Sequence, residues 1–196
     1  GDGAGLCASG NEEQNLVRRL AAPGGADAAI FADDVEGTTA LWTVDGSGAG
    51  ANFAVSTAAA HSPTHAWFVV DPPEISDRRL ATAAAIALPV SPPATLEFWH
   101  RYNFEAHYDG AVLESSLDGT LWTDIGAARI VAGGYTGTIS SSFQNPLAGR
   151  QAWGGDLAVF TRVEVDLTDF AGESRWLRWR FASDTSASAG GDCSGV

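Results

Sequence analysis

Lysine and methionine are absent from this chain, and cationic side chains are scarce. All eleven basic residues are arginine, against 24 Asp and Glu, so the formal charge of the 196 residues is −13. Like charges would repel a polyanion at encounter, which excludes nucleic acid and anionic membrane surfaces as partners. We attribute the missing lysine to a GC-rich coding bias. The missing methionine, with Gly1 as the first residue, leads us to expect a processed or cut N-terminus.

Long apolar runs and cysteines are also few. No run approaches the roughly 18 residues that a spanning helix needs, so membrane insertion is not expected. The two cysteines, Cys7 and Cys193, lie at opposite ends of the chain. In an oxidising compartment they would form a disulfide worth up to about 5 kcal/mol. The alternative is two unpaired thiols, whereas a metal site is disfavoured because neither has a His or second Cys at ligand spacing.

Apolar residues are plentiful and follow a strand-like pattern. The hydrophobic fraction is 45%, with seven Trp, and 23 Gly and 8 Pro punctuate short alternating segments. This pattern predicts an all-β fold over residues 29–196, an antiparallel two-sheet β-sandwich or a barrel. Residues 1–28 are expected to be an N-terminal arm. Within the arm, Glu12–Ala22 shows a possible helical period and is otherwise irregular.

The predicted strands number about ten. Asp118-Gly119 lies between two alternating segments and predicts a hairpin with a type I′ turn. In the segment that ends the domain, Leu177, Trp179 and Phe181 should face the core. Residues 133–156 break the pattern and are expected to form a functional or mobile loop, with their aromatics favouring order. The strands are expected at Ala29–Ala32, Leu41–Val44, Asn52–Val55, Ala66–Val70, Ala84–Leu88, Thr95–Tyr102, Ala111–Leu117, Leu121–Ile125, Thr161–Leu167 and Ser174–Phe181.

About 150 residues, from Ala32 to Asp184, carry motifs in an order that resembles a known family. The chain is similar to the MAM-like jelly-roll domain attached to secreted bacterial metallopeptidases of the immune inhibitor A type. The motifs are Asp33-Asp34-Val35-Glu36, Phe98-Trp99-His100-Arg101-Tyr102, Tyr108-Asp109-Gly110, Asp118-Gly119 with Trp122-Thr123-Asp124, Asn145-Pro146-Leu147-Ala148-Gly149-Arg150, Trp153-Gly154-Gly155, Val165-Asp166-Leu167 and Leu177-Arg178-Trp179-Arg180-Phe181.

This resemblance implies a secreted, extracellular, non-catalytic sandwich that binds calcium and serves as a recognition or accessory module of a larger protein such as a protease. Its partner would be a protein or glycan surface ligand. One departure stands out, because the closing strand usual in the family does not appear in residues 189–196. Either residues 6–20 take its place, or another chain completes the sheet by strand addition and the protein self-associates.

Five carboxylates are candidate calcium ligands. Asp34 and Glu36 stand two apart on an extended segment and would point the same way, and residues from other loops would complete an oxygen shell. The additional candidates are Asp77, Asp109 and Asp184. The competing interpretation is that these are solvated charges in a chain rich in acids.

Each pair of histidines has a structural interpretation and a functional one. His61 and His65 flank Pro63, so a zinc-binding helix is disfavoured and surface histidines are expected. His100 and His107 could serve as acid and base of a hydrolase or lyase with Glu105 and Asp109. Because His100 shares a strand face with Phe98, a hydrogen-bonded core histidine is the favoured interpretation.

An outer sheet face is the candidate ligand surface. Arg101, Arg178 and Arg180 are expected to form cross-strand ion pairs with Glu97, Glu105, Glu114 and Glu164. The same arginines could instead bind a carboxylate-bearing or glycan ligand, with Trp99 and Trp176 as stacking platforms. Arg150 is expected to lock its loop by donating to backbone carbonyls.

Overall fold

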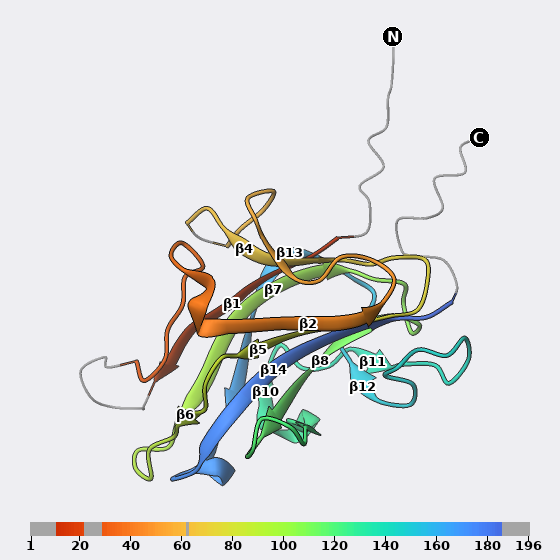
Figure 1. Ribbon diagram of the computed structural model, residues 1–196. Helices are drawn as coiled ribbons and strands as arrows, with labels where there is room; N and C mark the ends of the chain where they lie inside the picture. Colours follow the sequence, from red (N-terminus) through yellow and green to blue (C-terminus); the bar gives the residue numbers. More distant parts are fainter. Residues whose placement is uncertain (1–10, 22–28, 62, 186–196) are drawn as a thin grey trace.

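The alternating segments form two antiparallel sheets packed face to face (Figure 1), in a computed structural model that describes residues 11–21, 29–61 and 63–185. Sheet A has the strand order β10-β13-β7-β1-β4-β3, and sheet B has the order β2-β5-β14-β8-β9 with β6 beside β14; β11 and β12 form a separate two-stranded sheet. The described residues contain no α-helix, and none of their helical turns is long and apolar enough to cross a bilayer. The predicted all-β, two-sheet antiparallel sandwich is therefore confirmed.

The strand bounds follow the sequence pattern closely in the middle and C-terminal parts of the chain. Of the predicted strands, only Ala29–Ala32 is reduced to an isolated bridge at Phe31. The strands are β1 (Asn11–Ala21), β2 (Trp42–Gly48), β3 (Ala54–Ser56), β4 (Ala66–Val70), β5 (Ser76–Thr82), β6 (Ile86–Ala87), β7 (Thr95–Asn103), β8 (Gly110–Ser116), β9 (Thr123–Asp124), β10 (Ile130–Ala132), β11 (Gly137–Thr138), β12 (Gln151–Ala152), β13 (Asp156–Asp166) and β14 (Ser174–Ser183); the 3-10 turns are η1 (Thr39–Leu41), η2 (Ala127–Arg129) and η3 (Thr168–Phe170).

Aromatic side chains from both sheets fill the space between them. From β14, Leu177, Trp179 and Phe181 are buried as predicted, because alternate residues of a strand face one side of a sheet. Phe98 from β7 meets Trp179 edge-on, with ring centroids 5.2 Å apart. Burying one such side chain stabilises the fold by about 1.5–3 kcal/mol, so this layer dominates the stability of the sandwich.

The first described segment is a strand of sheet A. β1 pairs with β7 through Gln14 opposite His100, and with β4 through Gln14 opposite Trp67. The possible helix at Glu12–Ala22 is therefore wrong, because pairing on both sides satisfies the backbone and overrides a weak local period. The initial segment thus joins sheet A over residues 11–21, whereas its taking the place of the family's closing strand, and completion of the sheet by another chain, stay predictions. The boundary of the arm at residue 28 falls outside the described residues and stays a prediction.

Strand β5 was not predicted, and Asp77 lies within it rather than in a loop. The consecutive arginines Arg78 and Arg79 hide the alternation in the sequence. Arg78 is buried, and its guanidinium donates to Asn52 Oδ1 at 3.2 Å and to the carbonyl oxygen of Gly48 at 2.8 Å. A buried arginine is tolerated here because backbone carbonyls supply its acceptors.

The hairpin between β8 and β9 is confirmed, but its turn is wider than the predicted two-residue type I′ turn. Cross-strand pairing stops at Ser115 opposite Thr123. Only Gly119 has a positive φ, of 72°, whereas a type I′ turn needs positive φ at both central residues. Asp118 instead accepts from the backbone N–H groups of Thr120 and Leu121, each at 2.8 Å, so its side chain builds the turn.

His100 generates a testable pH dependence. It is 1% exposed among Phe98, Tyr102 and Trp153, and burial lowers its pKa to about 3. The unfolded chain, with a histidine pKa near 6.5, therefore binds a proton that the folded protein does not, and stability is lost as pH falls from 6.5 towards 3. In His100→Phe, we expect the loss of unfolding free energy between about pH 6 and pH 5 to be smaller than in the wild type by about 1 kcal/mol.

Urea unfolding at each pH measures this difference. Carboxylates that titrate below about pH 5 contribute equally to both proteins and cancel. If the free energy of unfolding changed equally with pH in the wild type and in His100→Phe, the lowered pKa of His100 would be contradicted.

Candidate functional site

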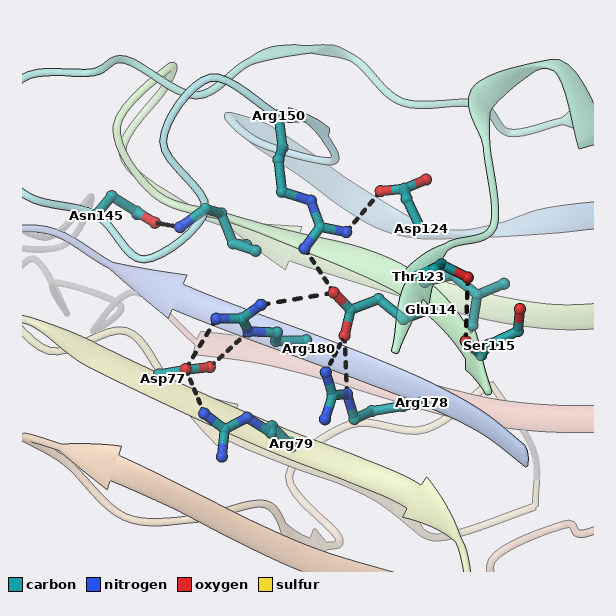
Figure 2. A network of polar contacts seen from close by, with 12 residues as sticks. Asp77, Arg79, Glu114, Ser115, Thr123, Asp124, Asn145, Arg150, Arg178 and Arg180 are labelled. Carbon is teal, nitrogen blue, oxygen red and sulfur yellow. Dashed lines mark hydrogen bonds and ion pairs between the residues drawn. The ribbon is translucent and has the colours of Figure 1, made fainter. Parts of the chain in front are cut away.

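Acidic and basic side chains gather on the outer surface of sheet B. Cross-strand register places Arg79 opposite Asp45 and Arg180, and places Glu114 opposite Arg178 and Asp124. Opposed residues share a face of the sheet, so the charges meet. We call this surface the charged face; its residues are Asp45, Asp77, Arg79, Glu114, Asp124, Arg150, Arg178 and Arg180, most of which Figure 2 shows.

Glu114 is the centre of the charged face. Its Oε1 accepts from Arg150 at 2.5 Å, its Oε2 accepts from Arg178 Nε at 2.8 Å, and Arg180 lies 3.5 Å from Oε1 (Figure 2). Burial alone would raise the pKa of Glu114, but hydrogen bonds and charges from Arg150 and Arg178 outweigh burial and lower it. Glu114 is therefore ionised at neutral pH although only 2% of its surface is exposed.

A second carboxylate, Asp77, links the remaining arginines. Arg180 donates to Asp77 Oδ1 at 2.8 Å, and Arg79 donates to its Oδ2 at 2.5 Å and to Asp45 at 2.9 Å. Burial opposes ionisation of Asp77, yet its pKa is lowered because Arg180 and Arg79 supply hydrogen bonds and positive charge. The predicted cross-strand ion pairs of Arg178 and Arg180 are thus present, with Asp77 as an acceptor that the sequence analysis had placed in a loop.

The segment 133–153 covers one end of the charged face and contributes Arg150. Its Leu147 and Ile139 pack on Val112 and Ala182 of the sheet. Asn145 Nδ2 donates to the carbonyl oxygens of Tyr108 at 2.6 Å and Ala182 at 3.0 Å.

Arg150 reaches from this segment to the carboxylates of Glu114 and Asp124, the latter at 2.6 Å. It therefore locks the loop as predicted, but through carboxylates rather than through backbone carbonyls.

Two tryptophans border the charged face. Arg178 lies over the ring of Trp122, 4.2 Å from its centroid, and Trp176 precedes Arg178 by two residues on the same side of β14. Both rings are partly exposed. Trp122 was missed as a ligand candidate, although the sequence predicted a strand at Leu121–Ile125, because its approach to Arg178 depends on how β9 and β14 flank β8.

Trp99 and Arg101 do not join this site. Both belong to β7 of sheet A, on the outer surface of the opposite layer. There His61 stacks on Trp99, with ring centroids 4.6 Å apart, and Arg101 lies 5.7 Å from the ring of Phe160. The predicted set of Trp99, Arg101, Trp176 and Arg178 is therefore divided between two faces, because the sequence shows which side of a strand a residue takes but not which sheet the strand joins.

Asp34 and Glu36 lie in the loop before β2, where their oxygens are engaged. Glu36 Oε1 accepts from the backbone N–H groups of Thr64 at 2.8 Å and His65 at 2.7 Å. Its Oε2 accepts from the Thr64 hydroxyl and lies 2.7 Å from His65 Nδ1. Hydrogen bonds from Thr64, then from His65, lower the pKa of Glu36 to about 2. This carboxylate fastens two loops together.

Asp109 and Asp184 do meet, together with Asp71, at one end of the core. Asp109 Oδ1 accepts from the backbone N–H of Asp184 at 2.8 Å, and the three residues are 1%, 1% and 5% exposed, respectively. Burial, then the charges of Asp71 and Asp184, raise the pKa of Asp109 to about 9. Asp71 follows β4 and was missed, although the alternation of that strand would place it on the inner side with Val69.

The five predicted calcium ligands are consequently not assembled into one site. Asp77 is held by arginines and Glu36 by Thr64 and His65, while Asp109 and Asp184 lie together. Within the described ranges, no group of three or more His, Cys, Asp or Glu side chains is arranged to hold a metal ion. Cys7 and Cys193 lie outside the described residues, so the disulfide stays a prediction.

The two histidines of the acid/base hypothesis are not brought together as a site. His100 is enclosed in the aromatic core, where it cannot contact a substrate. His107 instead lines a cavity of about 170 Å³ with Thr136, Gly137 and Thr138. None of the residues lining this cavity is acidic.

Comparison with known proteins finds no family model, no curated protein and no solved structure that matches this chain.

Glu114 generates a stability prediction. In Glu114→Gln, the charged partner of three arginines is lost at a buried position, and we expect the free energy of unfolding to fall by about 3 kcal/mol. In the control Asp169→Asn, a more exposed pair with Arg129 is lost, the side chains being 68% and 33% exposed, and the change should stay within about 0.5 kcal/mol. Urea unfolding at neutral pH compares the two variants. Equal losses of unfolding free energy would show that the ion pairs of Glu114 stabilise the fold no more than an exposed pair does.

Proposed function

We propose that this chain is a non-catalytic recognition module that binds a protein or glycan ligand on the charged face of sheet B. The observation that carries the proposal is the arrangement of Arg150, Arg178 and Arg180 around one buried carboxylate, with Trp122 and Trp176 beside them. Tryptophan and arginine dominate the energetics of binding surfaces. Here the ion pairs hold the arginines in place before a ligand arrives, which reduces the entropy cost of binding.

The absence of catalysis is part of the proposal. Its support is that the two histidines considered as acid and base occupy unrelated surroundings, one in the core and one at a cavity without carboxylates. General acid–base catalysis needs its groups within reach of the same substrate atoms. The buried carboxylates of the charged face are ionised by arginines, an arrangement suited to structure and recognition rather than proton transfer.

The setting that we propose is extracellular, with the domain serving as an accessory module of a secreted protein such as a protease. The support is the similarity of motifs between Ala32 and Asp184 to the MAM-like domains of immune inhibitor A-type metallopeptidases. The sandwich agrees with the fold that this similarity implies. An oxidising environment would also favour the proposed bond between Cys7 and Cys193.

We further propose that calcium binds at the end of the core where Asp71, Asp109 and Asp184 meet. The donor chemistry fits, because carboxylate oxygens are the ligands that calcium prefers, with backbone carbonyls and water completing six to eight positions. Burial and the neighbouring Asp71 and Asp184 raise the pKa of Asp109 to about 9, so its carboxyl group is protonated at neutral pH; a divalent cation would displace that proton and offset the charge of the neighbouring carboxylates. The side chains would have to reorient around the ion, since they do not form a ready cluster.

A binding screen tests the recognition function. Wild-type protein would be applied to arrays of neutral and acidic glycans and of immobilised extracellular proteins. We expect retention on at least one class, weakened at least tenfold in Trp122→Ala, since a central tryptophan is worth more than about 1.4 kcal/mol. The matched control is Trp99→Ala on the opposite face, which should bind normally. Binding to no target, or loss in Trp99→Ala alone, would overturn the proposal.

Thermal unfolding with calcium and with chelator tests the metal proposal. Binding to the folded state stabilises it by about 2.7 kcal/mol at a hundredfold excess over Kd, so Tm should rise with calcium concentration. Asp109→Asn should abolish the shift, while Asp34→Asn, in the separate exposed loop, should retain it. In chelator, Asp109→Asn should melt no lower than the wild type, because the amide oxygen still accepts from the backbone N–H of Asp184 and a buried carboxyl group with a raised pKa is removed. A Tm that calcium leaves unchanged would refute the site.

A further inference from the structure

Trp122 and Trp176 lie on the same side of sheet B with one strand between them. Trp176 on β14 is opposite Ser116 of β8, and Trp122 lies two residues before Asp124, which is opposite Glu114 of the same strand. The contact between Arg178 and Trp122 confirms that this ring lies over the charged face. Two inter-strand steps separate the tryptophan positions, a spacing of roughly 10 Å.

Each ring is held against the protein by a specific contact. The guanidinium of Arg178 supports Trp122 at 4.2 Å. Trp176 packs on the turn at Gly119, where a Cβ would lie 3.4 Å from the indole and where φ is 72°. Both rings nevertheless remain partly exposed. They are therefore oriented before binding and offer apolar surface at two fixed positions.

The charges between the rings are balanced. Four arginines and four carboxylates make up the charged face, and every arginine forms an ion pair with at least one carboxylate of the set. An anionic ligand would have to displace a carboxylate and approach a protein of net charge −13. A neutral ligand with many hydroxyl groups meets neither obstacle, and it can hydrogen-bond to Asp124 and Arg150, whose side chains are 32% and 26% exposed.

We propose that the charged face binds an extended neutral oligosaccharide, with sugar rings stacked on Trp122 and Trp176 and hydroxyl groups hydrogen-bonded between them. The ligand needs apolar ring faces at two points and hydroxyl groups around them, which is the chemistry of a neutral sugar chain. The two tryptophan positions lie two inter-strand steps apart on the backbone, roughly 10 Å, which favours a chain of more than one sugar residue over a monosaccharide. This inference rests on the proposed recognition function and specifies its ligand class.

Affinity electrophoresis in gels containing a soluble polysaccharide tests the ligand class. The neutral probes are mixed-linkage β-glucan, xylan and glucomannan, and the acidic probes are alginate and polygalacturonate. We expect retardation by at least one neutral probe and by neither acidic probe. Raising NaCl from about 0.05 M to about 0.5 M should change the affinity less than about twofold, because no net charge is neutralised on binding. Retardation by acidic probes only, or by none, would overturn the proposal.

Substitutions test whether the polysaccharide binds on the rings of Trp122 and Trp176. Trp122→Ala and Trp176→Ala should each weaken retardation at least tenfold, about 1.4 kcal/mol, while Trp122→Phe should retain part of it. Trp99→Ala and Leu121→Ser should bind as the wild type does, the latter because Leu121, 76% exposed beside the hairpin turn, would matter only for an apolar protein partner. Thermal melting of each variant identifies any that fail to fold, and Trp122→Phe remains informative if an alanine variant does fail.

The outcomes separate this inference from the function beneath it. Trp122-dependent binding to a protein or an acidic glycan on the arrays would refute the neutral-glycan assignment and leave the recognition function standing. If neither Trp122→Ala nor Trp176→Ala weakened binding to any target, the neutral-glycan assignment and the proposed recognition function of the charged face would both be refuted.

Discussion

The buried carboxylate of Glu114 is the constraint on which the outer side of sheet B depends. Removing a charged group from water is costly, and the cost is met here only because Arg150, Arg178 and Arg180 surround it (Figure 2). Two of these arginines belong to the adjacent strand β14, and the third arrives from the segment 133–153. One ionised side chain thereby fixes strand pairing, loop position and the orientation of the cations that face solvent.

The two sides of sheet B have different roles: the inner side forms part of the core, and the outer side presents a defined surface to solvent. The inner side carries Trp179, which packs in an aromatic layer with Phe98 of sheet A and with Trp153, and close packing there supplies most of the stability. The outer side carries paired charges that contribute less stability but hold a defined surface. Alternation along β14 is enough to build both, because Trp179 and Arg180 are neighbours in sequence and lie on opposite sides of the same strand.

Buried polar groups are handled in three different ways. Arg78 is surrounded by carbonyl oxygens, Asp77 and Glu114 by guanidinium groups, while Asp71, Asp109 and Asp184 lie beside one another. In the first two arrangements, groups of the chain itself supply the hydrogen bonds or the opposite charge that the buried group needs. The third brings three carboxyl groups together at one end of the core, one of them with a raised pKa, and it is the place where an added cation would have the largest effect.

Local alternation by itself determined β7, β8, β9, β14 and the second half of β13, the inward set of Leu177, Trp179 and Phe181, the hairpin at Asp118-Gly119 and hence the fold class, but not the short strands β10, β11 and β12. These features depend on period and turn chemistry, which short segments contain. Only tertiary structure decided that β1 is a strand, that Asp77 and Arg78 lie in β5, and that Trp99 and Trp176 occupy opposite layers. Strand order and sheet membership arise from long-range pairing and from shared burial between distant segments, so no local pattern can express them. The same holds for the charged face, where Arg150 meets Glu114 across 36 residues of sequence.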